Sequence, residues 1–306
     1  MRNTFAKEIN SLAQKNKNIV LLSGDIGNRM FDELKKSCPN QFINCGIAEA
    51  NMMSMAAGMG LCGIKPIIYT ITPFTTARCF EQIKIGVGYH KSPVIIIGTG
   101  SGLSYAELGP THHSLDDIAI LKTIPELNIL APADSIELKY FLSEALNSSY
   151  PTYIRIGKKG EPDLTPKNNI PSIGKANILL EGADILIIGI GPILKEAIEA
   201  ANILREHNIY ASVVSMGSIR PLDQDFLYNA SERGYKYWIT LEEHGLTGGL
   251  GSSILEWIVD NKSNKELKLH RLGMPTKFVN QLGDQKYIRG EFKLDSKGIV
   301  EFIFNL

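Results

Sequence analysis

The chain has 306 residues, enough for two ordinary domains with separate hydrophobic cores. Its 44 % hydrophobic and 21 % charged residues are typical of a soluble globular protein, and the 32 basic residues balance the 32 acidic ones. A net charge of zero excludes the strong field that draws proteins to nucleic acid or to an anionic membrane, so we expect neither partner. The N-terminus lacks the apolar core of a signal peptide, and the four cysteines are expected to be reduced thiols, so we expect a cytoplasmic protein. The four cysteines form no CxxC pair, and we expect no metal site within this chain.

Short β-branched runs alternate with helix-period segments, which is the pattern of a parallel sheet covered by helices. In the first half of the chain the expected strands are residues 19–22, 67–71, 94–98, 128–131 and 153–156. Asp134 is expected to cap a helix over 135–146.

Residues 158–175 are rich in glycine, proline and asparagine and are typical of a linker. Beyond them the sequence predicts strands at 185–189, 211–215 and 238–241, with helices at 193–206 and 250–259. We therefore expect a domain over 1–165, a linker over 166–175 and a domain over 176–306. Both domains are of the α/β class, and the first has helices on both faces of a parallel sheet. Ligands of such sheets bind at the carboxyl ends of the strands.

Glu49 is the only charged side chain in the segment 46–60. Small and apolar residues cover every face of that segment, which predicts a helix buried on all sides. A buried carboxylate is costly unless it is paired or protonated. Two interpretations stay open: a helix-start carboxylate that satisfies first-turn N–H groups, or a functional carboxyl with a raised pKa.

Two further segments have side chains that can take part in chemistry. His112 and His113 follow Gly109-Pro110 in a loop, and adjacent side chains point in different directions, so at most one imidazole faces a given ligand. Near neutral pH that imidazole can act as acid, base or hydrogen-bond donor, and capping of a carbonyl group is the alternative. Phe74 follows a strand, where an aromatic ring is either a stacking platform or part of the core.

Two glycine-rich turns have different interpretations. The turn at 189–192 has Leu194 where a dinucleotide-binding turn needs its third glycine, so we reject nucleotide binding there. The run at 248–251 precedes a helix and is compatible with anion binding or with a tight turn at a domain or subunit contact.

In order and spacing, these segments resemble the transketolase family. The resemblance rests on the Glu49 segment, the strand ending near Phe74, the Gly-Pro-Thr-His loop and Glu242-Glu243-His244 with the glycine run that follows. It covers residues 1–306 and implies a pyrimidine-binding domain followed by the family's C-terminal domain. The implied activity is transfer of a two-carbon ketol unit from a ketose to an aldose with thiamine diphosphate.

The resemblance also implies residue roles. Glu49 matches a glutamate that shares a proton with N1′ of the cofactor's aminopyrimidine, and Phe74 matches an aromatic that stacks on that ring. Asp25 and Ile26, after the first strand, match residues near the cofactor. His112 matches a histidine that hydrogen-bonds donor-substrate oxygens, so Glu49 and His112 are the expected catalytic residues.

The family's Gly-Asp-Gly…Asn motif, which holds Mg²⁺ and the cofactor's diphosphate on an upstream domain, is absent from this sequence. The chain begins where the pyrimidine-binding domain begins. We therefore expect a split enzyme, in which an N-terminal partner subunit holds Mg²⁺ and the diphosphate in an α2β2 heterotetramer. This chain is expected to be inactive alone.

The substrate end of the implied site departs from the family. Arg2 and Lys158 match basic residues that bind the sugar phosphate, although the second is usually arginine. Leu108 stands where an aspartate usually contacts a sugar hydroxyl, Gly100 where a histidine contacts substrate, and Ile71 where a second aromatic stacks. These changes predict an unusual ketose or aldose instead of the standard pentose phosphates.

Three alternatives stay open. The β subunit of a 2-oxo-acid dehydrogenase shares the layout and the cofactor, although the Gly-Pro-Thr-His loop favours the sugar branch. A condensation like that of deoxyxylulose-phosphate synthase is the second alternative. A non-catalytic regulatory partner is the third, and the presence of Glu49 and His112 argues against it.

Overall fold

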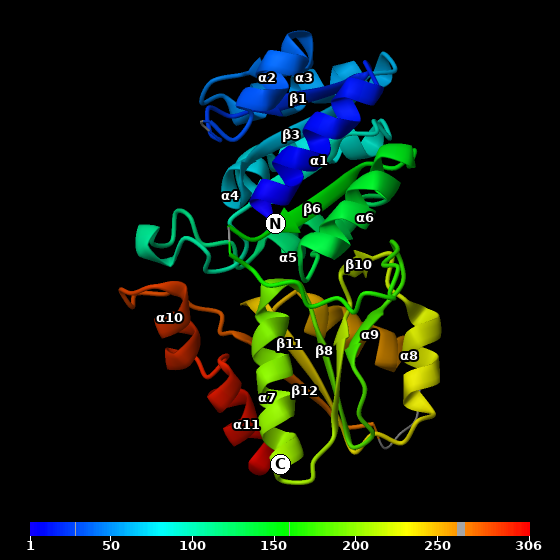
Figure 1. Cartoon of the computed structure of the whole chain (residues 1–306), viewed down its shortest axis with the longest axis vertical. Helices are drawn as coiled ribbons and strands as arrows, with labels where there is room; N and C mark the ends of the chain where they lie inside the picture. Colours follow the sequence, from blue (N-terminus) through cyan, green and yellow to red (C-terminus); the bar gives the residue numbers. More distant parts are fainter. Residues whose placement is uncertain (28, 159, 262–266) are drawn as a thin grey trace.

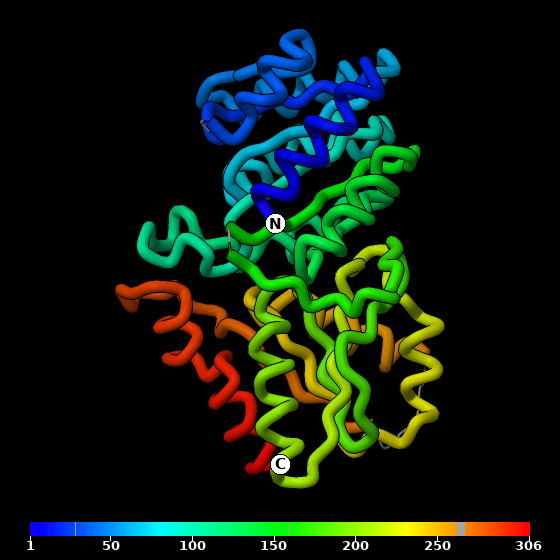
Figure 2. The backbone as a smooth tube through the Cα atoms, viewed as in Figure 1, coloured from blue at the N-terminus to red at the C-terminus, as the bar shows by residue number. Residues whose placement is uncertain are grey.

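The structure is a computed structural model that describes residues 1–27, 29–158, 160–261 and 267–306. Two α/β domains lie one above the other along the long axis of the molecule (Figure 1). The N-terminus lies near the boundary between the domains, and the C-terminus lies at the far end of the second domain (Figure 2). None of the described helices has the length and apolar character needed to cross a membrane.

The first domain is built on a seven-stranded sheet in the order β10-β5-β6-β4-β3-β1-β2. All neighbours are parallel except β10, which is antiparallel to β5 and comes from the second half of the chain. Every residue of β1, β4 and β6 is buried, as their β-branched composition predicts. The strands are β1 (Ile19–Ser23), β2 (Phe42–Asn44), β3 (Lys65–Ile71), β4 (Ile95–Thr99), β5 (Asn128–Leu130), β6 (Thr152–Ile156) and β10 (Ser218–Arg220).

Helices cover both faces of this sheet, as expected. One face packs against α1 (Arg2–Lys15), α2 (Asp32–Ser37) and α6 (Ser135–Asn147), the other against α3 (Glu49–Leu61), α5 (Asp117–Leu121) and the π-helix η3 (Gln82–Tyr89). Asp134 caps α6 by accepting hydrogen bonds from two first-turn N–H groups. The remaining short helices are η1 (Pro39–Gln41), α4 (Thr72–Thr75), η2 (Ala77–Cys79) and η4 (Ala106–Leu108).

The second domain has a five-stranded sheet in the order β12-β11-β8-β9-β7, parallel except for β7. Its strands are β7 (Asn177–Leu180), β8 (Ile185–Gly189), β9 (Ala211–Ser215), β11 (Tyr237–Gly245) and β12 (Leu269–Met274). One face packs against helices from the middle of the domain, the other against α7 and the C-terminal helices. The helices are η5 (Gly191–Ile193), α7 (Leu194–Glu206), α8 (Gln224–Ser231), α9 (Leu250–Asp260), α10 (Gln285–Glu291) and α11 (Ser296–Phe304).

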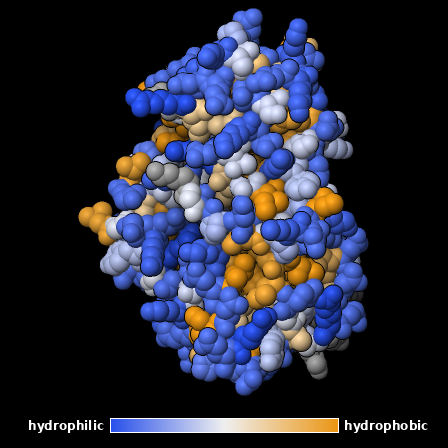
Figure 3. Space-filling model, in the orientation of Figure 1, coloured by the Kyte–Doolittle hydropathy of each residue, from blue (hydrophilic) through white to orange (hydrophobic). Residues whose placement is uncertain are grey.

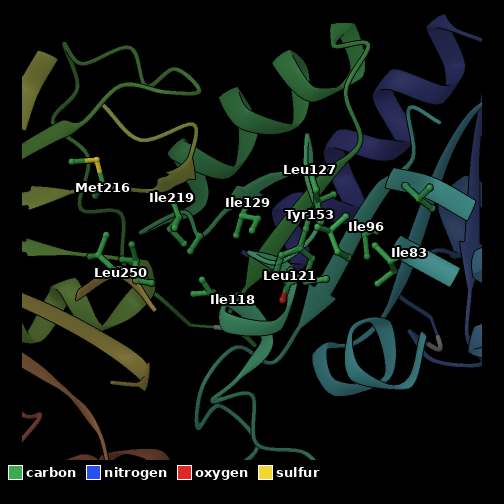
Figure 4. Packing of buried hydrophobic residues seen from close by; sticks show 14 of the residues in the cluster. Ile83, Ile96, Ile118, Leu121, Leu127, Ile129, Tyr153, Met216, Ile219 and Leu250 are labelled. Atoms are coloured by element: carbon green, nitrogen blue, oxygen red, sulfur yellow. The ribbon is translucent and has the colours of Figure 1, made fainter. Parts of the chain in front are cut away.

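The first domain occupies the crevice at the carboxyl ends of the second sheet. Gly191 N donates to Ala131 O at 3.1 Å, and Ala131 N donates to Gly217 O at 2.7 Å. The apolar core continues across this boundary, where Ile118 and Ile129 of the first domain lie close to Ile219 (Figure 4). An open α/β sheet commonly binds its ligand in such a crevice, and here the other domain fills it. On the surface, apolar side chains gather in a patch below the boundary on a face that is otherwise mostly hydrophilic (Figure 3).

The fold class is confirmed, and several element predictions need correction. The sequence predicted β8 and β9 to the residue, but it did not predict β2, β7, β10 or β12. The described part of the segment between β6 and β7 contains no helix or strand, and we propose to keep the domain boundary there, with the linker at 166–175.

The prediction that α3 is buried on all sides is wrong. The helix exposes Asn51, Ser54, Met55 and Leu61, and the preceding Ile47 is 79 % exposed. The described elements of this chain cover only the opposite face of the helix.

Candidate active site

Glu49 begins α3, and its carboxylate is 4 % exposed. Arg78 Nη1 donates to Glu49 Oε1 at 2.7 Å. Among the hydrogen bonds of the described residues, no first-turn N–H of α3 donates to this carboxylate. The structure therefore favours a carboxyl aimed at a site over a helix-capping carboxylate.

The Arg78 guanidinium also lies on the ring of Phe74, with 4.0 Å between its Cζ and the ring centre. A planar group with N–H donors therefore stacks on the aromatic ring and hydrogen-bonds to Glu49 at the same time. An aminopyrimidine ring needs an aromatic face to stack on and a carboxyl group to hydrogen-bond, so Phe74 and Glu49 fit that ring. Arg78 was not identified as a site residue from the sequence, because a lone arginine in a short helical turn has no distinguishing pattern.

The wall behind Glu49 is tightly packed. A Cβ added to Gly24 would lie 3.2 Å from Thr70 Oγ1 and 3.5 Å from Glu49 Cγ. Thr70 Oγ1 is buried and has no hydrogen-bond partner among the described residues. The Arg78 side chain on the other side is 45 % exposed, so the site is closed at the back and open at the front.

The two histidines of the loop point in different directions, as expected. His113 is buried, and its Nε2 lies 3.2 Å from Ala106 O, which is a structural contact. His112 stands edge-on to Phe74 at 5.3 Å between ring centres, and its Nδ1 lies 3.0 Å from Thr111 Oγ1. Partial burial, with smaller contributions from the charges of His113 and Arg78, lowers the pKa of His112, so its ring is neutral at pH 7.

Tyr105 and Lys158 continue the site beyond His112. The Tyr105 and His112 ring centres are 6.2 Å apart, and Lys158 Nζ lies 4.8 Å from the centre of the Tyr105 ring. Glu49, Arg78, Phe74, His112, Tyr105 and Lys158 thus form a chain of neighbouring contacts.

The other expected site residues lie near the ends of neighbouring strands. Asp25 and Ile26 follow β1, where Asp25 is exposed and accepts a hydrogen bond from Asn44 Nδ2 at 2.9 Å. Arg2 lies at the start of α1, and its buried Nε has no partner among the described residues. Burial raises the pKa of the Tyr69 hydroxyl, and the charge of Arg2 opposes that shift.

The loop that carries His112 is anchored by a buried ion pair of the first domain, and the arginine of this pair also donates to the second domain. Arg155 Nε donates to Asp117 Oδ2 at 2.8 Å, and Tyr153 donates to the same oxygen at 2.6 Å. Arg155 Nη2 also donates to Ser114 O at 2.6 Å and to Glu243 O at 2.9 Å. Burial by itself would raise the pKa of Asp117, but the charges of Arg155 and His244 and the hydrogen bond from Tyr153 together outweigh it and hold the pKa below its usual value.

The glycine run at 248–251 is an interdomain turn. The carboxylate of Glu242 accepts hydrogen bonds from Leu250 N at 2.7 Å and Gly251 N at 2.9 Å, so it takes the place an anion would need. A Cβ on Gly248 would lie 2.6 Å from Ala119 Cβ in the first domain, which explains the glycine.

Comparison with known proteins assigns both domains. Residues 1–161 match the family model of the transketolase pyrimidine-binding domain, and residues 174–299 match the transketolase C-terminal domain. The chain belongs to the transketolase family. This confirms the family resemblance, and dependence on thiamine diphosphate follows from membership.

Individual relatives are similar along nearly the whole chain. A subunit of the apulose-4-phosphate transketolase of Phocaeicola vulgatus is 34 % identical over 300 residues, covering 97 % of this chain and 94 % of the relative. The 6-deoxy-6-sulfo-D-fructose transketolase subunit SqwH of Clostridium sp. strain MSTE9 is 30 % identical, covering 98 % and 92 %. The 1-deoxy-D-xylulose-5-phosphate synthase of Halothermothrix orenii is 32 % identical and covers 99 % of this chain, but only 47 % of the relative is matched.

A solved structure described as a split-gene transketolase, inactive β4 tetramer, superposes with a TM-score of 0.86 at 29 % identity. The match covers 98 % of this chain and 95 % of the other. Together with the subunit-length relatives, it confirms the prediction of a transketolase-like transferase that acts within a split, multi-subunit enzyme.

Proposed function

We propose that this chain supplies the aminopyrimidine side of a thiamine diphosphate site in an α2β2 enzyme. An N-terminal partner subunit holds the diphosphate and Mg²⁺. The observation that carries this proposal is the Arg78 guanidinium, which bridges Glu49 and Phe74 in the manner of a flat, hydrogen-bonding ring. The open front of the site and the exposed apolar side chains of Ile47 and Leu61 support a covering partner.

In this proposal each residue has a stated role. The Glu49 carboxyl holds a proton at N1′ of the aminopyrimidine, and the Phe74 ring supports its face once Arg78 has moved away. Asp25 and Ile26 lie near the cofactor. When bound, thiamine diphosphate supplies the electron sink for breaking and forming the carbon–carbon bond.

His112 orients the substrate. If the Thr111 hydroxyl donates to Nδ1, the proton of the neutral ring is on Nε2, which can then donate to a substrate oxygen. A neutral donor contributes most where negative charge develops on that oxygen in the transition state.

The transferred group is a two-carbon ketol unit, and the substrate is a sugar with an anionic end. Lys158 is the basic residue at the far end of the contact chain, and Arg2 provides a second positive charge. The names of two relatives, which refer to apulose 4-phosphate and 6-deoxy-6-sulfofructose, support an unusual anionic sugar over the standard pentose phosphates.

The test is a substrate screen on the chain reconstituted with the candidate N-terminal subunit, thiamine diphosphate and Mg²⁺. We expect ketol transfer from a phosphorylated or sulfonated ketose, little transfer between xylulose 5-phosphate and ribose 5-phosphate, and no activity from the chain alone. Full activity with that standard pair contradicts the substrate proposal. Release of CO₂ from pyruvate, without ketol transfer, would instead place the enzyme in the 2-oxo-acid branch.

A further inference from the structure

The surface between His112 and Lys158 is shaped by one aromatic ring. Gly100, directly after β4, has φ +81°, and a Cβ placed on it would lie 2.0 Å from Cε2 and 2.2 Å from Cδ2 of Tyr105. The Tyr105 ring therefore occupies the space that a side chain at position 100 would need. It is held by its contact with backbone, so its position is fixed by the fold.

The same ring contacts both ends of the expected substrate path. Its edge-on neighbour is His112, at 6.2 Å between ring centres, and the Lys158 ammonium lies 4.8 Å from its centre. Within the described part of the chain no carboxylate lies at ion-pair distance from Lys158, so the cation–π contact is what orients this flexible side chain.

Lys158 also faces open space. Together with Ser104 and Lys286 of α10 it lines a cavity of about 570 Å³. The lining contains five basic side chains and four carboxylates, which are Glu161, Glu196, Glu199 and Asp295. The cavity has room for an anionic group next to the Lys158 ammonium. The ring face of Tyr105 offers only carbon atoms and π electrons, which pack against C–H bonds and do not hydrogen-bond sugar hydroxyls.

We propose that Tyr105 is a specificity-determining residue for the anionic end of the substrate. It holds the Lys158 ammonium at a fixed distance from His112, and its face forms the wall along which the sugar chain lies. The enzyme thereby selects anionic sugars by the separation between the reacting carbonyl and the anionic group. This inference rests on the proposed ketol transfer, because it assumes that the sugar substrates lie along the surface between His112 and Lys158.

The test uses the reconstituted enzyme with 3-hydroxypyruvate, an unphosphorylated ketol donor that is irreversibly decarboxylated. Two acceptors with the same three-carbon chain are compared, glyceraldehyde 3-phosphate and glyceraldehyde. In Tyr105→Leu we expect KM for the phosphorylated acceptor to rise about fivefold or more with kcat little changed, because a cation–π contact is lost. KM for glyceraldehyde should stay within about twofold. Tyr105→Phe keeps the ring and should behave like the wild type.

A second readout does not depend on turnover. Inorganic phosphate binding to the same assembled enzyme, measured by calorimetry, should weaken about fivefold in Tyr105→Leu and not in Tyr105→Phe. An equal loss with both acceptors, or unchanged phosphate binding in Tyr105→Leu, overturns the inference. The substrate screen tests the proposed function separately. If the wild-type enzyme uses neither aldehyde, phosphate binding alone decides the role of Tyr105.

Discussion

Two arginine–carboxylate pairs occupy different regions of the first domain, and their surroundings differ sharply. Arg155 and Asp117 meet at 2.8 Å where the domains join, with side chains only 2 % and 1 % exposed. Arg78 and Glu49 meet at 2.7 Å in the candidate active site, where the arginine is 45 % exposed. Tyr153 and backbone carbonyls add hydrogen bonds to the buried pair, and Asp117 Oδ1 is the atom of the pair left without a partner among the described residues.

The difference indicates what each region needs from outside the chain. The domain interface is closed and its buried ion pair is nearly satisfied by residues of this chain, so it is a structural unit. The active-site pair is open on one side, and its guanidinium occupies a place that would suit an aminopyrimidine ring. The chain therefore carries a complete domain interface and one part of a catalytic site.

The largest effect is expected from the active-site carboxylate. In the reconstituted enzyme, Glu49→Gln keeps the size of the side chain but cannot share a proton, so kcat should fall by about 10²–10⁴-fold. The free energy of unfolding should change by less than about 1 kcal/mol, because the pair is half open. The exposed Glu206→Gln in α7 is the matched control and should retain full activity. A kcat within a few-fold of wild type would show that Glu49 has no proton-transfer role.

The buried pair should respond in the opposite way. Asp117→Ala leaves the Arg155 guanidinium buried without its counter-charge, and we expect the free energy of unfolding in urea to fall by about 3–5 kcal/mol. Glu199→Ala, which breaks the exposed pair with Lys195 in α7, should cost less than about 1 kcal/mol. Similar losses in the two variants would contradict the structural role of the interface pair.

A pH dependence should come from the same interface. The buried carboxyl of Glu137 accepts hydrogen bonds from Ala133 N, Ser215 and Asn177, and burial raises its pKa from 4.5 to about 7. In the unfolded chain this carboxyl loses its proton near pH 4.5, whereas in the folded chain it keeps the proton up to about pH 7. The free energy of unfolding should therefore fall as pH rises between them, by roughly 3 kcal/mol at most.

Urea unfolding at about pH 5 and about pH 8 measures this dependence. In Glu137→Gln the free energy of unfolding should depend less steeply on pH. Part of the dependence should remain, because burial also raises the pKa of Glu242 to about 7. An unchanged slope in Glu137→Gln would mean that this carboxyl does not titrate in the expected range.

The smallest effect is expected from Arg78. Because its guanidinium must leave Phe74 and Glu49 before an aminopyrimidine binds there, Arg78→Ala should tighten thiamine diphosphate binding to the assembled enzyme about twofold to fivefold. The measurement is calorimetric, and Arg233→Ala on the far domain is the control. Weaker binding in Arg78→Ala would show that the arginine supports the cofactor.

The sequence predicted the elements whose signals are local. The isoleucine-rich β8 is a continuous apolar run and β9 is centred on two valines, and each was predicted to the residue. The strand β10 has three residues and forms because it pairs with β5 of the other domain, a long-range contact that local sequence does not encode. The exposed face of α3 was missed because its small and apolar residues have the composition of a buried helix.

The site was predictable only where the family pattern names a residue. Glu49, Phe74 and His112 were predicted from motifs, and the structure brings all three together through Arg78 and ring contacts. Arg78 and Tyr105 depend on how three loops meet in space. The Tyr105 ring occupies the space that a side chain at Gly100 would need, and only the three-dimensional structure shows this contact.

The central claim is that the cofactor site is completed by another chain, and calorimetry tests it most directly. Thiamine diphosphate with Mg²⁺ is titrated into this chain alone, into the candidate N-terminal subunit alone, and into the mixture. We predict saturable binding by the mixture only, with the chain alone giving no binding signal. Tight binding by this chain alone would contradict the account, because the diphosphate and Mg²⁺ would then be held by residues of this chain.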